Sequence, residues 1–194
     1  MTGVSAFAAP VYLPSGPQQN VALSTITNGG WTQCYAHTFD VSIGNQAEGV
    51  LSVCTDDYLM MAGRVTGSDT VMELAATLRS DAIQVTGSNS TTHLSNGSQW
   101  WFANNWSWGF TDAGDTVNNF QCDTSPSPHS MCLHTIAGVG GYRIDDILGL
   151  NGSTRYEKLF FQASAGEQVP EPGSIALALT ALGALGFVSR RRKS

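Results

Sequence analysis

The C-terminal tail of this chain restricts what the protein can be more than any other stretch of its sequence. The run Ile175–Val188 contains no charged side chain, and Arg190, Arg191, Arg192 and Lys193 follow it almost at once. An apolar segment that ends in a cluster of basic residues is typical of a membrane helix whose basic end stays in the cytoplasm. The run is shorter than the roughly 20 residues of an ordinary spanning helix. We therefore expect the helix to extend over about residues 174–189, with the arginine stems reaching to the interface.

A rigid tripeptide, Pro170-Glu171-Pro172, precedes the apolar run. Proline fixes its own φ angle and has no N–H donor, so this segment stays extended and accessible to a processing enzyme. A plain linker is the alternative for the tripeptide alone, but the apolar run and the basic end behind it favour a signal. The combination closely resembles the PEP-CTERM sorting signal of bacterial exported proteins, on the residues Val169, Pro170, Glu171, Pro172, Gly173, Arg190, Arg191 and Arg192.

The resemblance covers only the tail, and it implies where the protein goes rather than what its body does. It implies that a membrane protease-transpeptidase, exosortase, recognises the Pro-Glu-Pro segment and removes the tail. Exosortase and the inner membrane are therefore the expected partners. We expect the protein to be held in the bacterial inner membrane before processing, and to reach the cell surface or the extracellular space afterwards.

The beginning of the chain contains a second export feature. Ala6-Phe7-Ala8 fits the small-x-small pattern that precedes a signal-peptidase cut. A chance match in an alanine-rich chain is the alternative. We interpret residues 1–8 as a signal-peptide remnant, residues 9–166 as an extracytoplasmic β domain and residues 167–194 as the sorting tail.

Charge and cysteine content agree with an exported body. Four of the nine basic residues lie in the tail, so the body holds 13 acidic and 5 basic side chains, and this acidity argues against nucleic-acid binding. Four cysteines without a Cys-x-x-Cys pair predict two disulfides rather than a metal site. Three connectivities are open, and we favour the two short local loops, which join Cys34 to Cys54 and Cys122 to Cys132. We expect no metal and no cofactor.

Short apolar or alternating runs separated by glycines predict strands through most of the body. The expected strands are Tyr35–Val41, Val50–Cys54, Tyr58–Val65, Ile83–Gly87, a long run over Gln99–Thr111, and Arg155–Ala163. Residues 71–79 begin like a capped helix, and strand and helix stay open there. The turn spacing predicts a mainly β fold, a single sandwich- or barrel-like domain, with the C-terminal membrane helix added.

An aromatic cluster is the best candidate for a binding feature. Trp106, Trp108 and Phe110 alternate with period two, which predicts that they share one face of a strand. Such rings either form a β core, which we favour, or stack on sugar rings as a ligand platform. In the second case neighbouring polar side chains would bind hydroxyls. These are Asn104, Asn105, Asp112 and Asp115.

The remaining polar residues point to no reaction class. We interpret the acidic pairs Asp56-Asp57, Asp112/Asp115 and Asp145-Asp146 as solvated surface, with glycosidase acids as the alternative. The histidines, at 37, 93, 129 and 134, are expected to be structural, and no catalytic motif is present. The body resembles secreted bacterial domains of unassigned function, on Leu59–Asp69, Trp106–Phe110 and Gly140–Arg143. We therefore assign no catalytic residue and expect a non-enzymatic protein of the cell envelope or extracellular polysaccharide. A carbohydrate-binding module and a secreted glycoside hydrolase remain the alternatives.

Overall fold

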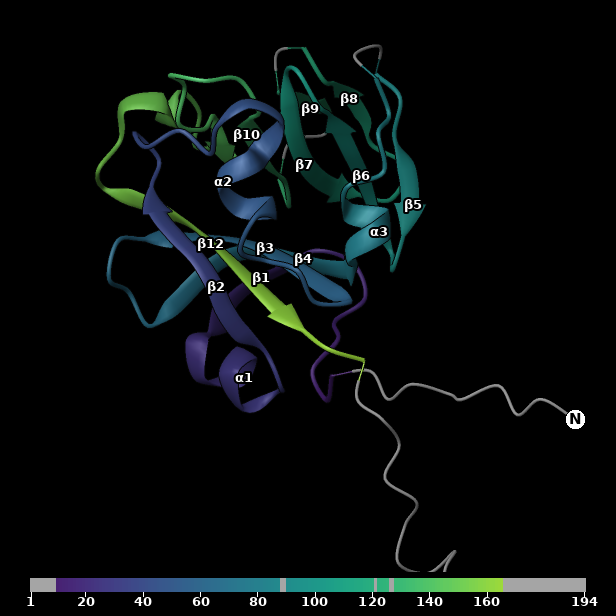
Figure 1. The fold of residues 1–194 in the computed structure, drawn as a ribbon, viewed down its shortest axis with the longest axis vertical. Helices are drawn as coiled ribbons and strands as arrows, with labels where there is room; N and C mark the ends of the chain where they lie inside the picture. Colours follow the sequence, from purple (N-terminus) through teal and green to yellow (C-terminus); the bar gives the residue numbers. More distant parts are fainter. Residues whose placement is uncertain (1–9, 88–89, 121, 126–127, 166–194) are drawn as a thin grey trace, which may run out of the picture. The chain divides into compact units, whose positions relative to one another are not determined.

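The fold was obtained as a computed structural model, which describes residues 10–87, 90–120, 122–125 and 128–165 (Figure 1). Residues Ala9–Ala165 form one compact unit. It contains two five-stranded antiparallel sheets and a two-stranded ribbon. The expected mainly β fold is thus confirmed. The predicted signal remnant, sorting tail and membrane helix lie outside the described residues. Within those residues, no helix has the length and apolar character needed to cross a membrane.

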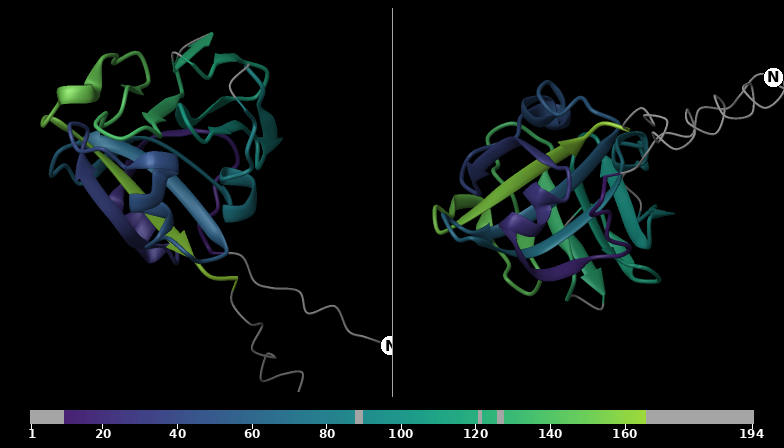
Figure 2. Two further views of the ribbon diagram at one scale, coloured as in Figure 1. Left: turned by 45° about the horizontal axis from the view of Figure 1, so that its top comes forward. Right: turned by 90° about the horizontal axis from the view of Figure 1, so that it is seen from below.

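The first sheet, sheet 1, has the strand order β1-β4-β3-β12-β2. Its strands are β1 (Gln18–Ala22), β2 (Thr32–Thr38), β3 (Tyr58–Val65), β4 (Thr70–Leu78) and β12 (Tyr156–Ala163). The C-terminal strand β12 lies between β2 and β3, so it is interior to the sheet (Figures 1 and 2). Because strands of this kind are buried on both faces, β3, β4 and β12 are rich in apolar residues.

The second sheet, sheet 2, has the order β11-β10-β7-β6-β5. Its strands are β5 (His93–Ser95), β6 (Ser98–Ala103), β7 (Ser107–Asp112), β10 (Met131–His134) and β11 (Arg143–Ile144). The ribbon β8 (Thr116–Asn118) and β9 (Asp123–Ser125) belongs to the segment between β7 and β10. Val117 of this segment packs with Trp101, Cys122 and Cys132 in a small separate cluster. The ribbon segment therefore covers one face of sheet 2.

Short helical turns connect the strands. They are α1 (Leu23–Asn28), η1 (Asn45–Ala47), α2 (Glu48–Leu51), α3 (Arg79–Ala82) and η2 (Leu150–Gly152). Ile26 of α1 packs with Met60, Leu74 and Phe161 on one face of sheet 1. The larger cluster lies on the other face, where Met61 and Phe160 of sheet 1 meet Trp108 and Phe110 of sheet 2. The main core is therefore the layer between the two sheets.

One transverse row of sheet 1 is polar, which is unusual for a row that crosses a buried sheet. The register aligns Gln19 with Glu73, Glu73 with Gly63, Gly63 with Lys158, and Lys158 with His37. Directly opposed residues in antiparallel strands share a face. Glu73 and Lys158 are both buried, and Gly63 between them leaves room for a side chain from sheet 2. A Cβ at residue 63 would lie 2.6 Å from Cδ1 of Ile144.

The structure also corrects several expected elements. Val50–Cys54 is not a strand, because Glu48–Leu51 is helical and the buried residues Ala47, Val50 and Cys54 recur at helical spacing. Ile83–Gly87 makes only an isolated bridge, at Val85. The long run Gln99–Thr111 is two paired strands, β6 and β7, joined by a turn. Residues 71–79, left open between helix and strand, belong to β4 apart from their last residue.

Candidate functional site

The three aromatic residues predicted to share a strand face are separated in the structure. Trp108 and Phe110 lie on β7 and are completely buried in the core between the sheets. Trp106 belongs to the turn that joins β6 to β7, and its side chain is 37% exposed. The period-two pattern is broken because the turn, not the strand, contains residue 106. The favoured interpretation as a β core is therefore confirmed for Trp108 and Phe110, while the alternative, a ligand platform formed by all three rings, is wrong.

Trp106 instead pairs with Phe120, a residue that sequence reasoning did not single out. The two ring centroids are 4.0 Å apart, and Phe120 is 53% exposed. The backbone of Trp106 also contacts the residue that follows β10, since Thr135 N–H donates to Trp106 O at 3.0 Å. Phe120 precedes Cys122, whose disulfide holds this segment beside β10. Trp106 and Phe120 thus form a pair of exposed rings in a region held by a disulfide. The sequence did not predict this pair, because its two residues belong to different loops.

Both disulfides expected from the local spacing are present. Cys34 of β2 is bonded to Cys54, and Cys122 is bonded to Cys132 of β10. The first joins the edge strand of sheet 1 to the turn after α2. The second ties the covering segment of sheet 2 to the sheet itself. The second bridge therefore fixes a segment whose own apolar cluster is small.

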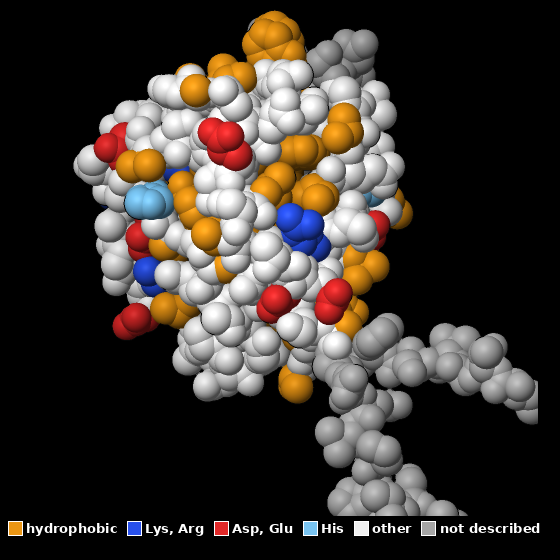
Figure 3. All heavy atoms as spheres, viewed as in Figure 1, with side chains coloured by type: hydrophobic (Ala, Val, Ile, Leu, Met, Phe, Trp, Pro, Cys, Tyr) orange, Lys and Arg blue, Asp and Glu red, His pale blue; other side chains and the backbone are white. Residues whose placement is uncertain are grey.

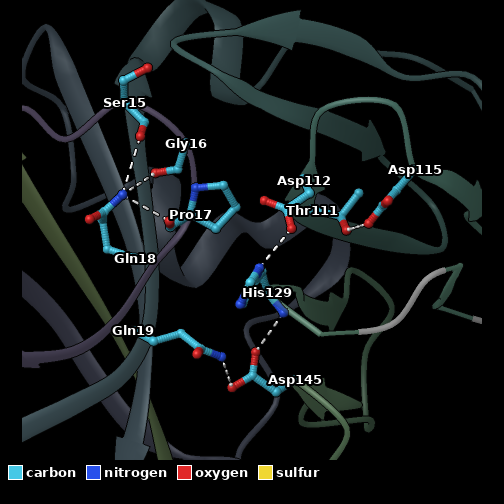
Figure 4. A network of polar contacts seen from close by, with 10 residues as sticks. All are labelled: Ser15, Gly16, Pro17, Gln18, Gln19, Thr111, Asp112, Asp115, His129 and Asp145. Atoms are coloured by element: carbon cyan, nitrogen blue, oxygen red, sulfur yellow. Dashed lines mark hydrogen bonds and ion pairs between the residues drawn. The ribbon is translucent and has the colours of Figure 1, made fainter.

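A cluster of polar side chains joins the two sheets, and Figure 4 shows four of its five members, Gln19, Asp112, His129 and Asp145. Its members are Gln19 of β1, Glu73 of β4, Asp112 of β7, and His129 and Asp145 from the segments flanking β10 and β11; we call this set the seam. Gln19 Nε2 donates to Asp145 Oδ2 at 3.0 Å, which is a direct link between the sheets. His129 N donates to Asp145 Oδ1 at 3.0 Å, and His129 Nδ1 lies 2.7 Å from Asp112 Oδ2. His129 and Asp145 both have positive φ angles, as polar residues in tight loops often do.

Glu73 is the buried member of the seam. Its side chain has no exposed surface, and neither carboxyl oxygen has a hydrogen-bond partner of ordinary geometry among the described residues. Burial, reinforced by the nearby Asp145 carboxyl, raises the pKa of Glu73 to about 10, while the Gln19 amide opposes the shift. Asp145 is not at ordinary hydrogen-bonding geometry to Glu73, so the pKa shift comes from burial and from the like charge of Asp145. Glu73 is therefore an uncharged acid at neutral pH.

The seam changes the interpretation of two acidic pairs. Asp112 and Asp145 come from different pairs in the sequence, yet both contact His129. Asp115 accepts from Thr111 Oγ1 at 2.6 Å. Asp57 lies elsewhere and accepts from Ala165 N at 2.8 Å. Within the described ranges, no three His, Cys, Asp or Glu side chains converge closely enough to hold a metal ion.

The surface offers no concentration of positive charge in the view of Figure 3. Lysine and arginine side chains appear there as separate groups that do not gather into a patch. The buried Lys158 adds nothing to the surface charge, because it donates to Thr38 O at 2.6 Å and Val41 O at 2.5 Å inside the molecule. Burial lowers the pKa of Lys158 to about 7. The face in view is thus unlike a nucleic-acid interface.

Comparison with known proteins identifies the tail and leaves the body unassigned. The PEP-CTERM protein-sorting motif matches residues 168–193. No curated protein and no solved structure is significantly similar to the chain. The motif includes the Pro-Glu-Pro segment, the apolar run and the basic cluster. It implies an exported protein that is anchored transiently in the membrane and processed by exosortase.

Proposed function

We propose that the body is a non-enzymatic component of the cell envelope or of extracellular polysaccharide, delivered there by its sorting tail. The observation that carries this proposal is the PEP-CTERM motif at residues 168–193, attached to a β body with two disulfides. Disulfides persist in oxidising compartments outside the cytoplasm. The absence of a conventional catalytic motif in the sequence also favours a structural or binding role.

Fractionation of the native host tests this proposal. The full-length chain, with an upstream leader restored, should appear as a processed body in the envelope or polysaccharide fraction. A matched chain that lacks residues 167–194 should instead be found in the periplasm or the medium. Purified body should leave the host polysaccharide intact. Hydrolysis of that polysaccharide, lost on Asp145→Asn, would overturn the non-enzymatic assignment and favour the glycoside hydrolase.

A second candidate function, carbohydrate binding, is favoured by the exposed pair Trp106–Phe120. Aromatic rings bind the apolar faces of sugars at low entropic cost, since they are rigid. The two rings have centroids 4.0 Å apart and are both accessible. If they bind a glycan, Trp106→Ala and Phe120→Ala should each abolish retention on an array of bacterial polysaccharides. Leu94→Ala is the matched control, because Leu94 is 66% exposed and lies on β5, away from the pair in the chain. Equal retention by all three variants would exclude this site.

A further inference from the structure

The seam between the two sheets contains more acid groups than its one imidazole can balance. Glu73 comes from sheet 1, and Asp112 and Asp145 come from the side of sheet 2. The charges of Asp145 and Asp112 both disfavour ionisation of Glu73. A site with this arrangement must either hold a cation or keep one acid protonated.

The hydrogen bonds distinguish Glu73 from Asp145. Both oxygens of Asp145 accept N–H donors, one from Gln19 and one from the backbone of His129. Such donors stabilise negative charge on the carboxyl that accepts them. Neither oxygen of Glu73 has a hydrogen-bond partner of ordinary geometry within the described part of the chain, and Glu73 is fully buried. An ionised, unpartnered and buried carboxylate would be costly, so the proton resides on Glu73.

The groups around Glu73 leave no other source of compensation. From β1 it faces the uncharged amide of Gln19, and from β3 its neighbour in the row is Gly63. From sheet 2 it faces Asp145 and Asp112. His129 stands next to these two aspartates, and Arg143 donates to the backbone oxygens of Asp145 and Cys122. The imidazole of His129 and the guanidinium of Arg143 therefore contact acceptors other than Glu73.

We propose that the seam takes up one proton when it closes, and that Glu73 holds this proton. The contact that the paired strands β1 and β4 make with the loop containing Asp145 is then a pH-sensitive latch. When the latch opens, Glu73 meets water and releases the proton at any pH above its ordinary range. Opening should therefore become easier as the pH rises, by up to about tenfold in the opening equilibrium for each pH unit. Such a latch needs no ligand or partner, so it is independent of the proposed function.

Amide hydrogen exchange on the full-length chain in a non-ionic detergent tests the latch. Between about pH 5 and about pH 8, protection factors of the β1 amides should fall by up to tenfold per unit. Glu73→Gln keeps the shape and removes the acid, so its β1 protection should not depend on pH. Glu48→Gln, at an exposed glutamate in α2, is the matched control and should keep the wild-type slope. A slope that survives Glu73→Gln would overturn the proposal.

A direct measurement keeps the test decisive if Glu73→Gln does not fold. The carboxyl carbon of Glu73, observed by NMR in the wild-type chain, should have the chemical shift of a protonated acid at neutral pH. A carboxylate shift at neutral pH would contradict the latch. Addition of Ca²⁺ should leave this resonance unchanged. Conversion to the carboxylate by Ca²⁺ would also overturn the proposal, because the seam would then close around a metal ion rather than a proton.

Discussion

Ile144 of β11 packs its side chain directly onto Gly63 in the middle of sheet 1. The contact occupies the gap in the polar row between Glu73 and Lys158. The next residue of the chain is Asp145, so the same contact sets Asp145 beside Glu73. The contact of Ile144 with Gly63 therefore determines how the two sheets pack, and it also brings the carboxyls of Glu73 and Asp145 together.

Gly63→Ala should destabilise the body. The new Cβ would lie 2.6 Å from Ile144 Cδ1, and inserting a methyl group into a packed core costs about 1–3 kcal/mol. Urea unfolding followed by tryptophan fluorescence would measure the loss. Gly152→Ala is the control, because a Cβ there meets nothing within 4 Å. Combining Gly63→Ala with Ile144→Ala should cost less than the sum of the two single changes, and strict additivity would argue against the contact.

The pH dependence of stability should have two opposing parts. For Glu73, whose pKa rises from 4.5 to about 10, the unfolded chain loses the proton first. The free energy of unfolding then falls with pH across that window, by at most about 1.4 kcal/mol per unit. For Lys158, whose pKa falls from 10.5 to about 7, the unfolded chain binds more protons, so stability rises with pH between those values.

Together these shifts predict a fall in stability from pH 4.5 to about 7 and a nearly level region from about 7 to 10. Denaturant titrations across this range would show it. In Glu73→Gln the initial fall should disappear and the later rise should become visible. In Lys158→Met the fall should instead continue toward pH 10. Identical profiles in all three proteins would refute both assignments.

All four cysteines should resist alkylation in exported protein that has not been reduced. The bonded pairs are Cys34–Cys54 and Cys122–Cys132, and mass spectrometry would detect any free thiol. Replacing Cys122 and Cys132 by serine should lower the free energy of unfolding by roughly 2–4 kcal/mol, mainly because the unfolded chain gains freedom. Free thiols in the mature exported protein would contradict this prediction.

Ala181→Arg should release the unprocessed chain from the membrane fraction. An arginine at the centre of a membrane helix adds about 2.5–3.5 kcal/mol to the free energy of insertion. Ala181→Leu, which keeps the run apolar, should stay in the membrane. If the arginine variant fractionates like the leucine variant, the tail is not the anchor.

Pro170→Ala combined with Pro172→Ala should slow processing of the tail. Without the prolines the membrane helix can extend outward through residues 170–172, and an extended substrate strand is lost. Uncleaved protein should accumulate in the inner membrane, as measured by intact mass of the protein from its native host. Pro14→Ala, in the body, should be processed normally. A mature wild-type species that retains Arg190–Lys193 would exclude removal of the tail.

Sequence reasoning was most successful where apolar patterning alone decides the structure. Tyr58–Val65 was predicted with the bounds of β3, and Arg155–Ala163 differs from β12 by one residue. It failed at Val50–Cys54, where strand and helix patterns overlap over a few residues. Because that run is short, tertiary packing determines whether it forms a strand or a helix.

The seam was beyond sequence reasoning for a different reason. Glu73 lay in a segment open between helix and strand, so its buried face could not be assigned. Its neighbours Gln19, Asp112 and Asp145 are brought to it by strand register and sheet packing, which are long-range properties. The pair Trp106–Phe120 was hidden in the same way, because its two rings belong to different connections.

The position of β12 has a consequence for how the protein matures. This strand follows all the others in the chain, yet it pairs with both β2 and β3 in the interior of sheet 1. Sheet 1 therefore cannot close until residues near 163 have emerged from the export channel. The sorting tail begins only a few residues later. Closure of the sheet and arrival of the predicted anchor thus fall close together in translocation. We therefore expect the body to complete its folding at the membrane surface, where its sorting tail is processed.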